Sequence, residues 1–163
     1  MKTLTSDIKN KISSFKDNFP EGRQRSAIIE ALHLVQHKNE GYLTPELLGE
    51  VAEVLDVPAM YVYEVATFYS MFSTKPVGRN NVAICTNISC MLRGSDEILN
   101  HIENKLSIKV GESTADGNIF LKKEEECLAA CTGAPMMMVD HIYIENLDIK
   151  KVDEVINKLT KKT

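Results

Sequence analysis

The spacing of the hydrophobic residues changes near residue 75, so the chain contains two regions that must fold differently. Before residue 73, apolar residues recur every three or four positions, which places them on one face of an α-helix. Beyond residue 80, short β-branched and apolar runs alternate with helical patterns. The segment between them, Ser73 to Asn80, contains Pro76 and Gly78 and has no regular period. We predict a helical domain over residues 1–75 and a sheet-containing domain over residues 81–163.

Four helices are predicted in the first region. Gly41 is typical of a helix end, whereas Thr44 followed by Pro45 is typical of an N-cap and a first helical residue. The second helix is expected to run from Arg23 to Lys38. The four predicted apolar faces are Ile8, Ile12 and Phe15; Ile28, Ile29, Leu32 and Val35; Leu47, Leu48, Val51 and Leu55; and Val62, Val65, Phe68, Tyr69 and Phe72. We expect these helices to pack as a bundle.

The second region has the pattern of a small sheet with two helices. Asp140-His141 separates two short apolar runs and predicts a tight turn between strands. The expected elements are a strand Val82–Cys85, a helix Gly94–Leu106 capped by Ser95, a strand Ile119–Lys122, two strands Met136–Val139 and Ile142–Ile144, and a closing helix with Val152, Val155, Ile156 and Leu159. The order is strand, helix, three strands, helix, so the whole chain is predicted to be α+β.

Composition and motifs exclude several functions. The net charge is −4 and the basic residues are scattered, so no nucleic-acid partner is expected. The most apolar runs, such as Ala134 to Val139, are far shorter than a bilayer-spanning helix, so no membrane span is expected. The first residues lack the apolar part of a secretory signal, which predicts a cytoplasmic location. Neither G-x-G-x-x-G nor a phosphate-binding P-loop occurs, so the chain has no evident nucleotide site.

The four cysteines form two close pairs in the second region: Cys85 with Cys90, and Cys127 with Cys131. In a [2Fe–2S] cluster each iron binds two bridging sulfides and needs two protein thiolates to become tetrahedral. Two short loops with two cysteines each can supply these ligands. The four cysteines are therefore the candidate metal-binding and cofactor-binding residues, and we assign no catalytic acid, base or nucleophile.

The cysteine spacing also fits other sites. Structural zinc is commonly bound by two cysteine pairs with similar spacings. Disulfides are disfavoured in a reducing location. Free cysteines that serve as small core residues are a further alternative. A thioredoxin-type dithiol enzyme is disfavoured because the chain has no C-x-x-C. On spacing alone, an iron–sulfur cluster and a zinc ion both remain open.

The remaining soft or basic side chains are not expected to bind a metal. The consecutive residues Met136, Met137 and Met138 alternate between the faces of a strand, so they cannot converge on one ion. The histidines are dispersed along the chain, at His33, His37, His101 and His141. Metal binding is therefore assigned to the cysteines alone.

Several segments resemble the small iron–sulfur subunit of respiratory complex I, known as the 24-kilodalton subunit family of NADH:quinone oxidoreductase. The resemblance covers roughly Phe19 to Leu159. The segments that carry it are Arg23–Ala31, Gly41-Tyr42-Leu43, Val65–Phe72, Cys85–Cys90 and Cys127–Pro135. The last, Cys-Leu-Ala-Ala-Cys-Thr-Gly-Ala-Pro, is the most specific and makes zinc a minor alternative.

The resemblance implies a thioredoxin-like [2Fe–2S] ferredoxin domain after a helical bundle domain. It implies that Cys85 and Cys90 bind one iron and that Cys127 and Cys131 bind the other. The cluster would exchange electrons with the FMN of a partner subunit that oxidises NADH. Further iron–sulfur subunits would complete a peripheral arm, which in a bacterium lies on the cytoplasmic face of the inner membrane, and the activity would belong to the complex. NAD-linked hydrogenases and formate dehydrogenases are alternative host complexes.

Two features near these motifs carry further expectations. Ala129 stands where the family often has Gly, so a positive φ there would be disfavoured. The aromatic run of Phe68, Tyr69 and Phe72 can contribute to a subunit interface, although such residues more often belong to a core.

Overall fold

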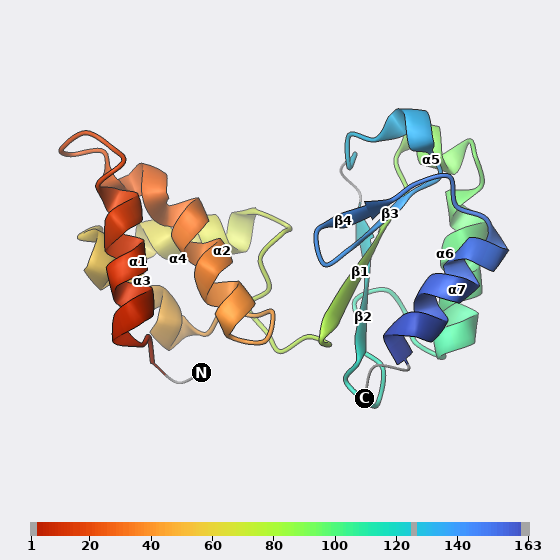
Figure 1. Cartoon of the computed structure of the whole chain (residues 1–163), viewed down its shortest axis with the longest axis horizontal. Helices are drawn as coiled ribbons and strands as arrows, with labels where there is room; N and C mark the ends of the chain where they lie inside the picture. Colours follow the sequence, from red (N-terminus) through yellow and green to blue (C-terminus); the bar gives the residue numbers. More distant parts are fainter. Residues whose placement is uncertain (1–2, 125–126, 161–163) are drawn as a thin grey trace. The chain divides into compact units, whose positions relative to one another are not determined.

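The computed structural model describes residues 3–124 and 127–160. The chain divides into two compact units, Met1–Pro76 and Val77–Thr163 (Figure 1). Each unit has its own hydrophobic core. Within the described residues, no helix is both long enough and apolar enough to cross a bilayer.

The first unit consists of helices, as predicted. They are α1 (Ser6–Lys16), a 3₁₀ turn η1 (Gln24–Ala27), α2 (Ile28–Lys38), α3 (Pro45–Leu55) and α4 (Ala59–Phe68). Thr44 caps α3 by accepting a hydrogen bond from the backbone N–H of Leu47, and Pro45 is the first helical residue. The predicted start of α3 is therefore confirmed. The predicted helix from Arg23 is wrong in its first turn, where residues 24–27 are 3₁₀, and Ile29 is partly exposed rather than buried.

The end of α4 differs from the prediction, which extended the helix to Phe72. The helix stops at Phe68, and Tyr69 has an extended backbone with φ −85° and ψ 126°. Gln36 explains the change, because its side chain donates to the Met71 carbonyl at 3.0 Å and accepts from the Ser73 N–H at 2.8 Å. These bonds satisfy backbone groups that a longer helix would pair internally. Phe68 is left 79% exposed, whereas Phe72 is buried.

The second unit is built around a four-stranded mixed sheet in the order β2-β1-β3-β4. Its elements are β1 (Asn80–Cys85), α5 (Ile88–Met91), α6 (Ser95–Leu106), β2 (Ile119–Glu124), a 3₁₀ turn η2 (Cys131–Gly133), β3 (Met137–Val139), β4 (Ile142–Ile144) and α7 (Ile149–Thr160). Strands β1 and β2 are parallel, and the other neighbours are antiparallel. The predicted order of strands and long helices is confirmed, and α5 is an additional short helix.

Two turns in this unit depend on left-handed backbone. Asp140 and His141 have φ of 47° and 71°, the signs that a two-residue hairpin turn requires, so the predicted turn is confirmed. The predicted cap of α6 is wrong: Gly94, with φ 89°, is the N-cap, and Ser95 is the first helical residue. Glycine adopts this conformation without the steric penalty that a side chain would bring.

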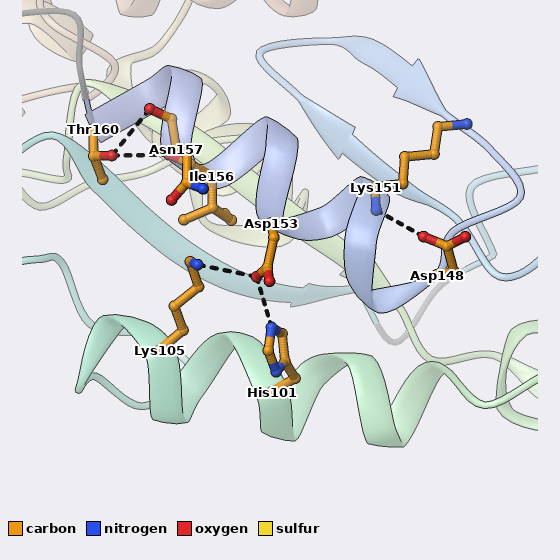
Figure 2. Close-up of polar contacts among 8 residues, drawn as sticks. All are labelled: His101, Lys105, Asp148, Lys151, Asp153, Ile156, Asn157 and Thr160. Carbon is orange, nitrogen blue, oxygen red and sulfur yellow. Dashed lines mark hydrogen bonds and ion pairs between the residues drawn. The ribbon is translucent and has the colours of Figure 1, made fainter.

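Helices α6 and α7 lie side by side on one face of the sheet (Figure 1). Ile98 and Ile102 of α6 pack in the same core as Val152 and Ile156 of α7. At the surface, Asp153 accepts a hydrogen bond from His101 at 2.7 Å and pairs with Lys105 at 3.1 Å (Figure 2). The hydrogen bond from His101 is the largest cause that lowers the pKa of Asp153, and the hydrogen bond from Lys105 is the second.

Candidate metal centre

The first cysteine pair lies where β1 ends and α5 begins. Cys85 is the last residue of β1, and Cys90 lies in α5. Between them, the side chain of Asn87 caps α5 by accepting a hydrogen bond from the backbone N–H of Ile88 at 2.9 Å. The resulting turn brings Cys90 back beside Cys85, and the two thiols share a hydrogen bond. Both side chains are buried.

Burial controls the chemistry of Cys90 in the absence of a metal. Loss of hydration raises the pKa of this thiol to about 11, and the hydrogen bond with Cys85 contributes to the rise. A hydrogen bond with the backbone of Met136 acts in the opposite direction, because it stabilises the thiolate. The thiol is therefore protonated at neutral pH, and a metal that binds Cys90 must displace its proton.

The second pair lies on the loop between β2 and β3. Cys131 begins the short turn η2, and both Cys127 and Cys131 are exposed. Their Sγ atoms are 3.3 Å apart, which is too far for a disulfide bond of about 2.05 Å. Two thiolates on one tetrahedral ion at about 2.3 Å would be about 3.8 Å apart. A small increase in the separation of the two Sγ atoms would therefore let both bind one ion.

The loop also points a backbone donor at one of its sulfurs. The N–H of Ala129 donates a hydrogen bond to Sγ of Cys127 over 3.3 Å. Ala129 has φ 60°, so it adopts the left-handed conformation that its side chain disfavours. After Gly133, the chain passes through a cis Ala134–Pro135 bond into β3.

The two pairs approach each other from separate loops. Charge on Cys131 is the smallest of the causes that raise the pKa of Cys90. Cys85 and Cys90 pack in one apolar cluster with Ala134 and Met136, against Leu128 and Ala130. Over residues 3–124 and 127–160, no three His, Cys, Asp or Glu side chains surround a single ion. The cysteines are thus arranged as two pairs rather than as one group of four.

This arrangement fits a binuclear cluster. Each iron needs two thiolates, because bridging sulfides complete its coordination. A zinc ion would need all four sulfurs around one point. Backbone N–H groups beside the thiols, at Ala129 and Met136, suit the negative charge of an iron–sulfur centre. Neither amide is predicted from the sequence, because a backbone donor has no residue signature.

Comparison with known proteins gives the family. Residues 12–160 match the model of the family described as thioredoxin-like [2Fe-2S] ferredoxin. The E subunit of NADH-quinone oxidoreductase from Rickettsia bellii is 46% identical over 86% of this chain and 83% of its own length. An E subunit of the same enzyme from Rhizobium meliloti is 42% identical over 91% of this chain and 86% of its own. These matches confirm the family resemblance.

Among solved structures, an NAD+-reducing [NiFe]-hydrogenase in the air-oxidized state has the same fold, with a TM-score of 0.70 over 86% of this chain. The sequences are 24% identical, and the match spans 24% of the hydrogenase chain. At 24% sequence identity, the likeness to the hydrogenase shows a shared fold alone. Family model and curated relatives together show that the chain belongs to the thioredoxin-like [2Fe–2S] ferredoxin family and is homologous to the E subunit of NADH-quinone oxidoreductase.

Proposed function

We propose that this chain is the electron-transfer subunit of an NADH:quinone oxidoreductase and holds one [2Fe–2S] cluster on Cys85, Cys90, Cys127 and Cys131. The observation that carries the proposal is the packing of Leu128 and Ala130, from the loop of the second pair, against the apolar cluster that contains Cys85 and Cys90. Cys85 and Cys90 would hold one iron, and Cys127 and Cys131 the other. When bound, the cluster supplies one-electron transfer.

The protein's own groups would hold the cluster and tune its potential. The N–H of Ala129 and the backbone of Met136 stabilise negative charge on the sulfurs of Cys127 and Cys90. The first pair is buried and keeps water away from one side of the site. The second pair is exposed, so a redox partner can approach the other side.

The electrons would come from a partner, because the sequence shows no nucleotide-binding motif. We propose a flavoprotein subunit that binds FMN and NADH, together with further iron–sulfur subunits, in a peripheral arm at the cytoplasmic face of the membrane. The names of the curated relatives, which are subunits of NADH-quinone oxidoreductase, support this assignment. NADH oxidation would belong to the complex rather than to this chain alone.

Metal analysis of the purified chain tests the cluster directly. We expect iron and acid-labile sulfide in equal amounts, two of each per chain, and a visible spectrum that bleaches on reduction. Zinc without iron would overturn the proposal in favour of a zinc-stabilised adaptor. Cys90→Ser and Cys127→Ser should each lose most of the cluster, because a hydroxyl is a poorer ligand than a thiolate. Ser89→Ala, next to Cys90 in α5, is the matched control and should keep the cluster.

The host complex has one competing assignment. The shared fold with the NAD+-reducing hydrogenase favours a related diaphorase subunit as the alternative, in a hydrogenase or a formate dehydrogenase. Co-purification separates the two, because the chain should be recovered with an NADH-oxidising flavoprotein and with either quinone-reducing or hydrogenase subunits. Reduction of the chain's cluster by NADH in the recovered complex would support electron exchange with flavin. Failure of NADH to reduce it would contradict that exchange.

A further inference from the structure

The segment that follows β4 is hydrogen-bonded to the turn that follows Cys131. The backbone N–H of Asn146 donates to the carbonyl of Gly133 at 2.6 Å, and the N–H of Leu147 donates to the carbonyl of Pro135 at 2.9 Å. The β3–β4 hairpin makes this contact possible, because it returns the chain beside its own entry point. Residues 145–147, called the brace below, therefore contact the second cysteine loop directly.

The brace and the loop are also in close side-chain contact. A Cβ atom placed on Gly133 would lie 2.5 Å from Cδ and 2.6 Å from Cβ of Glu145. Those distances are shorter than any that packed atoms adopt, so Glu145 occupies the space that the missing side chain leaves. Gly133 lies two residues after Cys131 and belongs to the same 3₁₀ turn. Glu145 therefore packs directly against the turn that carries Cys131.

Helix α7 anchors the brace through Lys151. Its ammonium group donates a hydrogen bond to the backbone carbonyl of Glu145 at 2.6 Å. Its backbone N–H donates to Oδ1 of Asp148 at 2.7 Å, which fixes the residue in the first turn of the helix. Figure 2 shows the Lys151 side chain directed away from α6, so it takes no part in the contact among His101, Lys105 and Asp153.

We propose that Lys151 is a positioning residue that holds Cys131 in the geometry of the metal centre through the brace. The proposal rests on the proposed function in one respect, namely that Cys131 is a ligand. An exposed loop with a single 3₁₀ turn has little structure of its own to fix a sulfur atom. A ligand must be held by surrounding hydrogen bonds, and the loss of such supporting groups typically costs about 10- to 100-fold in metal affinity.

The test compares three variants of the full chain. Lys151→Met removes the ammonium and keeps most of the side-chain stem, Lys151→Arg keeps a cationic donor, and Lys150→Met removes the same charge from the exposed neighbouring position. In cluster-loaded protein, we expect Lys151→Met to shorten the cluster lifetime in the presence of a chelator by about tenfold. We also expect it to broaden or shift the electron paramagnetic resonance spectrum of the reduced cluster. Lys151→Arg and Lys150→Met should stay within about twofold of the wild type.

Amide hydrogen exchange in the cluster-free chain provides a second measurement that does not depend on iron. We expect Lys151→Met to accelerate exchange at Asn146 and Leu147 by about tenfold while exchange at the buried amides of β1 is unchanged. Equal acceleration in β1 would show that Lys151 stabilises the whole second unit rather than the brace, and it would overturn the proposal. Wild-type behaviour of Lys151→Met in both measurements would also overturn it. Absence of iron and sulfide from the wild type would instead refute the proposed function, and the exchange measurement would still decide whether the brace depends on Lys151.

Discussion

The backbone N–H of Ala129 donates a hydrogen bond to Sγ of Cys127 over 3.3 Å, and Ala129 has a left-handed backbone with φ 60° in this arrangement. A non-glycine residue in this region costs about 1–2 kcal/mol, because its Cβ approaches a backbone carbonyl. The cysteine loop therefore contains local strain at a position where the contact with the sulfur is made.

Replacing Ala129 with Gly should relieve that strain. We expect Ala129→Gly to raise the free energy of unfolding of the second unit by up to about 1 kcal/mol, because part of the gain is offset by the greater freedom of glycine in the unfolded chain. Hydrogen exchange at the β1 amides measures this change. Ala130, with φ −114°, is the control, and Ala130→Gly should be neutral or destabilising. A loss of stability in Ala129→Gly would contradict the assigned strain.

Gly78 is required by the close approach of two backbone segments. A Cβ at this position would lie 2.5 Å from the carbonyl carbon of Ile119 and 2.7 Å from the nitrogen of Phe120. Backbone atoms in a sheet cannot move aside as a flexible side chain can, so Gly78→Ala should destabilise the second unit by about 1–3 kcal/mol. The control is Gly49→Ala, in α3, where no atom lies within 4 Å of the added carbon. It should leave its own unit unchanged or stabilise it by about 0.5–1 kcal/mol, because alanine favours a helix interior.

The four thiols should react at two different rates in the reduced, cluster-free chain. Cys127 and Cys131 are exposed, whereas Cys85 and Cys90 are buried and burial raises the pKa of Cys90 to about 11. We expect alkylation at about pH 8 to modify the second pair first, since the thiolate is the reactive form and must be accessible. Peptide mapping by mass spectrometry gives the order. Modification of all four at one rate would contradict the burial of the first pair.

The contact between α6 and α7 should make stability depend on acid pH. The hydrogen bonds from His101 and Lys105 lower the pKa of Asp153 below the usual range of an aspartate. A carboxyl whose folded-state pKa is lowered adds stability above its unfolded pKa, and that contribution is lost as the pH falls through the folded value. The melting temperature of the wild type should therefore drop more steeply below about pH 4 than that of Asp153→Asn.

The neighbouring exposed carboxylate of Glu154 provides the control for this experiment. Glu154→Gln removes the same charge from α7 and should retain the acid dependence of the wild type. Parallel curves for the wild type and Asp153→Asn would show that the contact does not contribute to the acid response.

The sequence alone determined the order of the main elements and the family of the chain. Apolar spacing located the four helices of the first unit and the order of strands and long helices in the second, because the periods of 3.6 and 2 are properties of the backbone itself. The Cys127–Pro135 segment indicates the family, which the comparisons confirm. The pairing of the four cysteines predicts them as ligands, and this assignment stays a prediction.

Only the tertiary structure decided where α4 ends, which backbone conformation Ala129 adopts and which residues contact the second cysteine loop. Gln36 ends α4 at Phe68 through bonds to residues 71 and 73, although the apolar spacing continues to Phe72. The positive φ of Ala129 opposes the preference of its side chain, and the contact from Lys151 through Glu145 to Gly133 joins segments that are separate in the sequence. The bonds of Gln36 and the contact of Glu145 with Gly133 join parts of the chain that only folding brings together. Local propensity gives way at the end of α4 because the Gln36 bonds satisfy part-buried backbone groups that would otherwise be left unpaired.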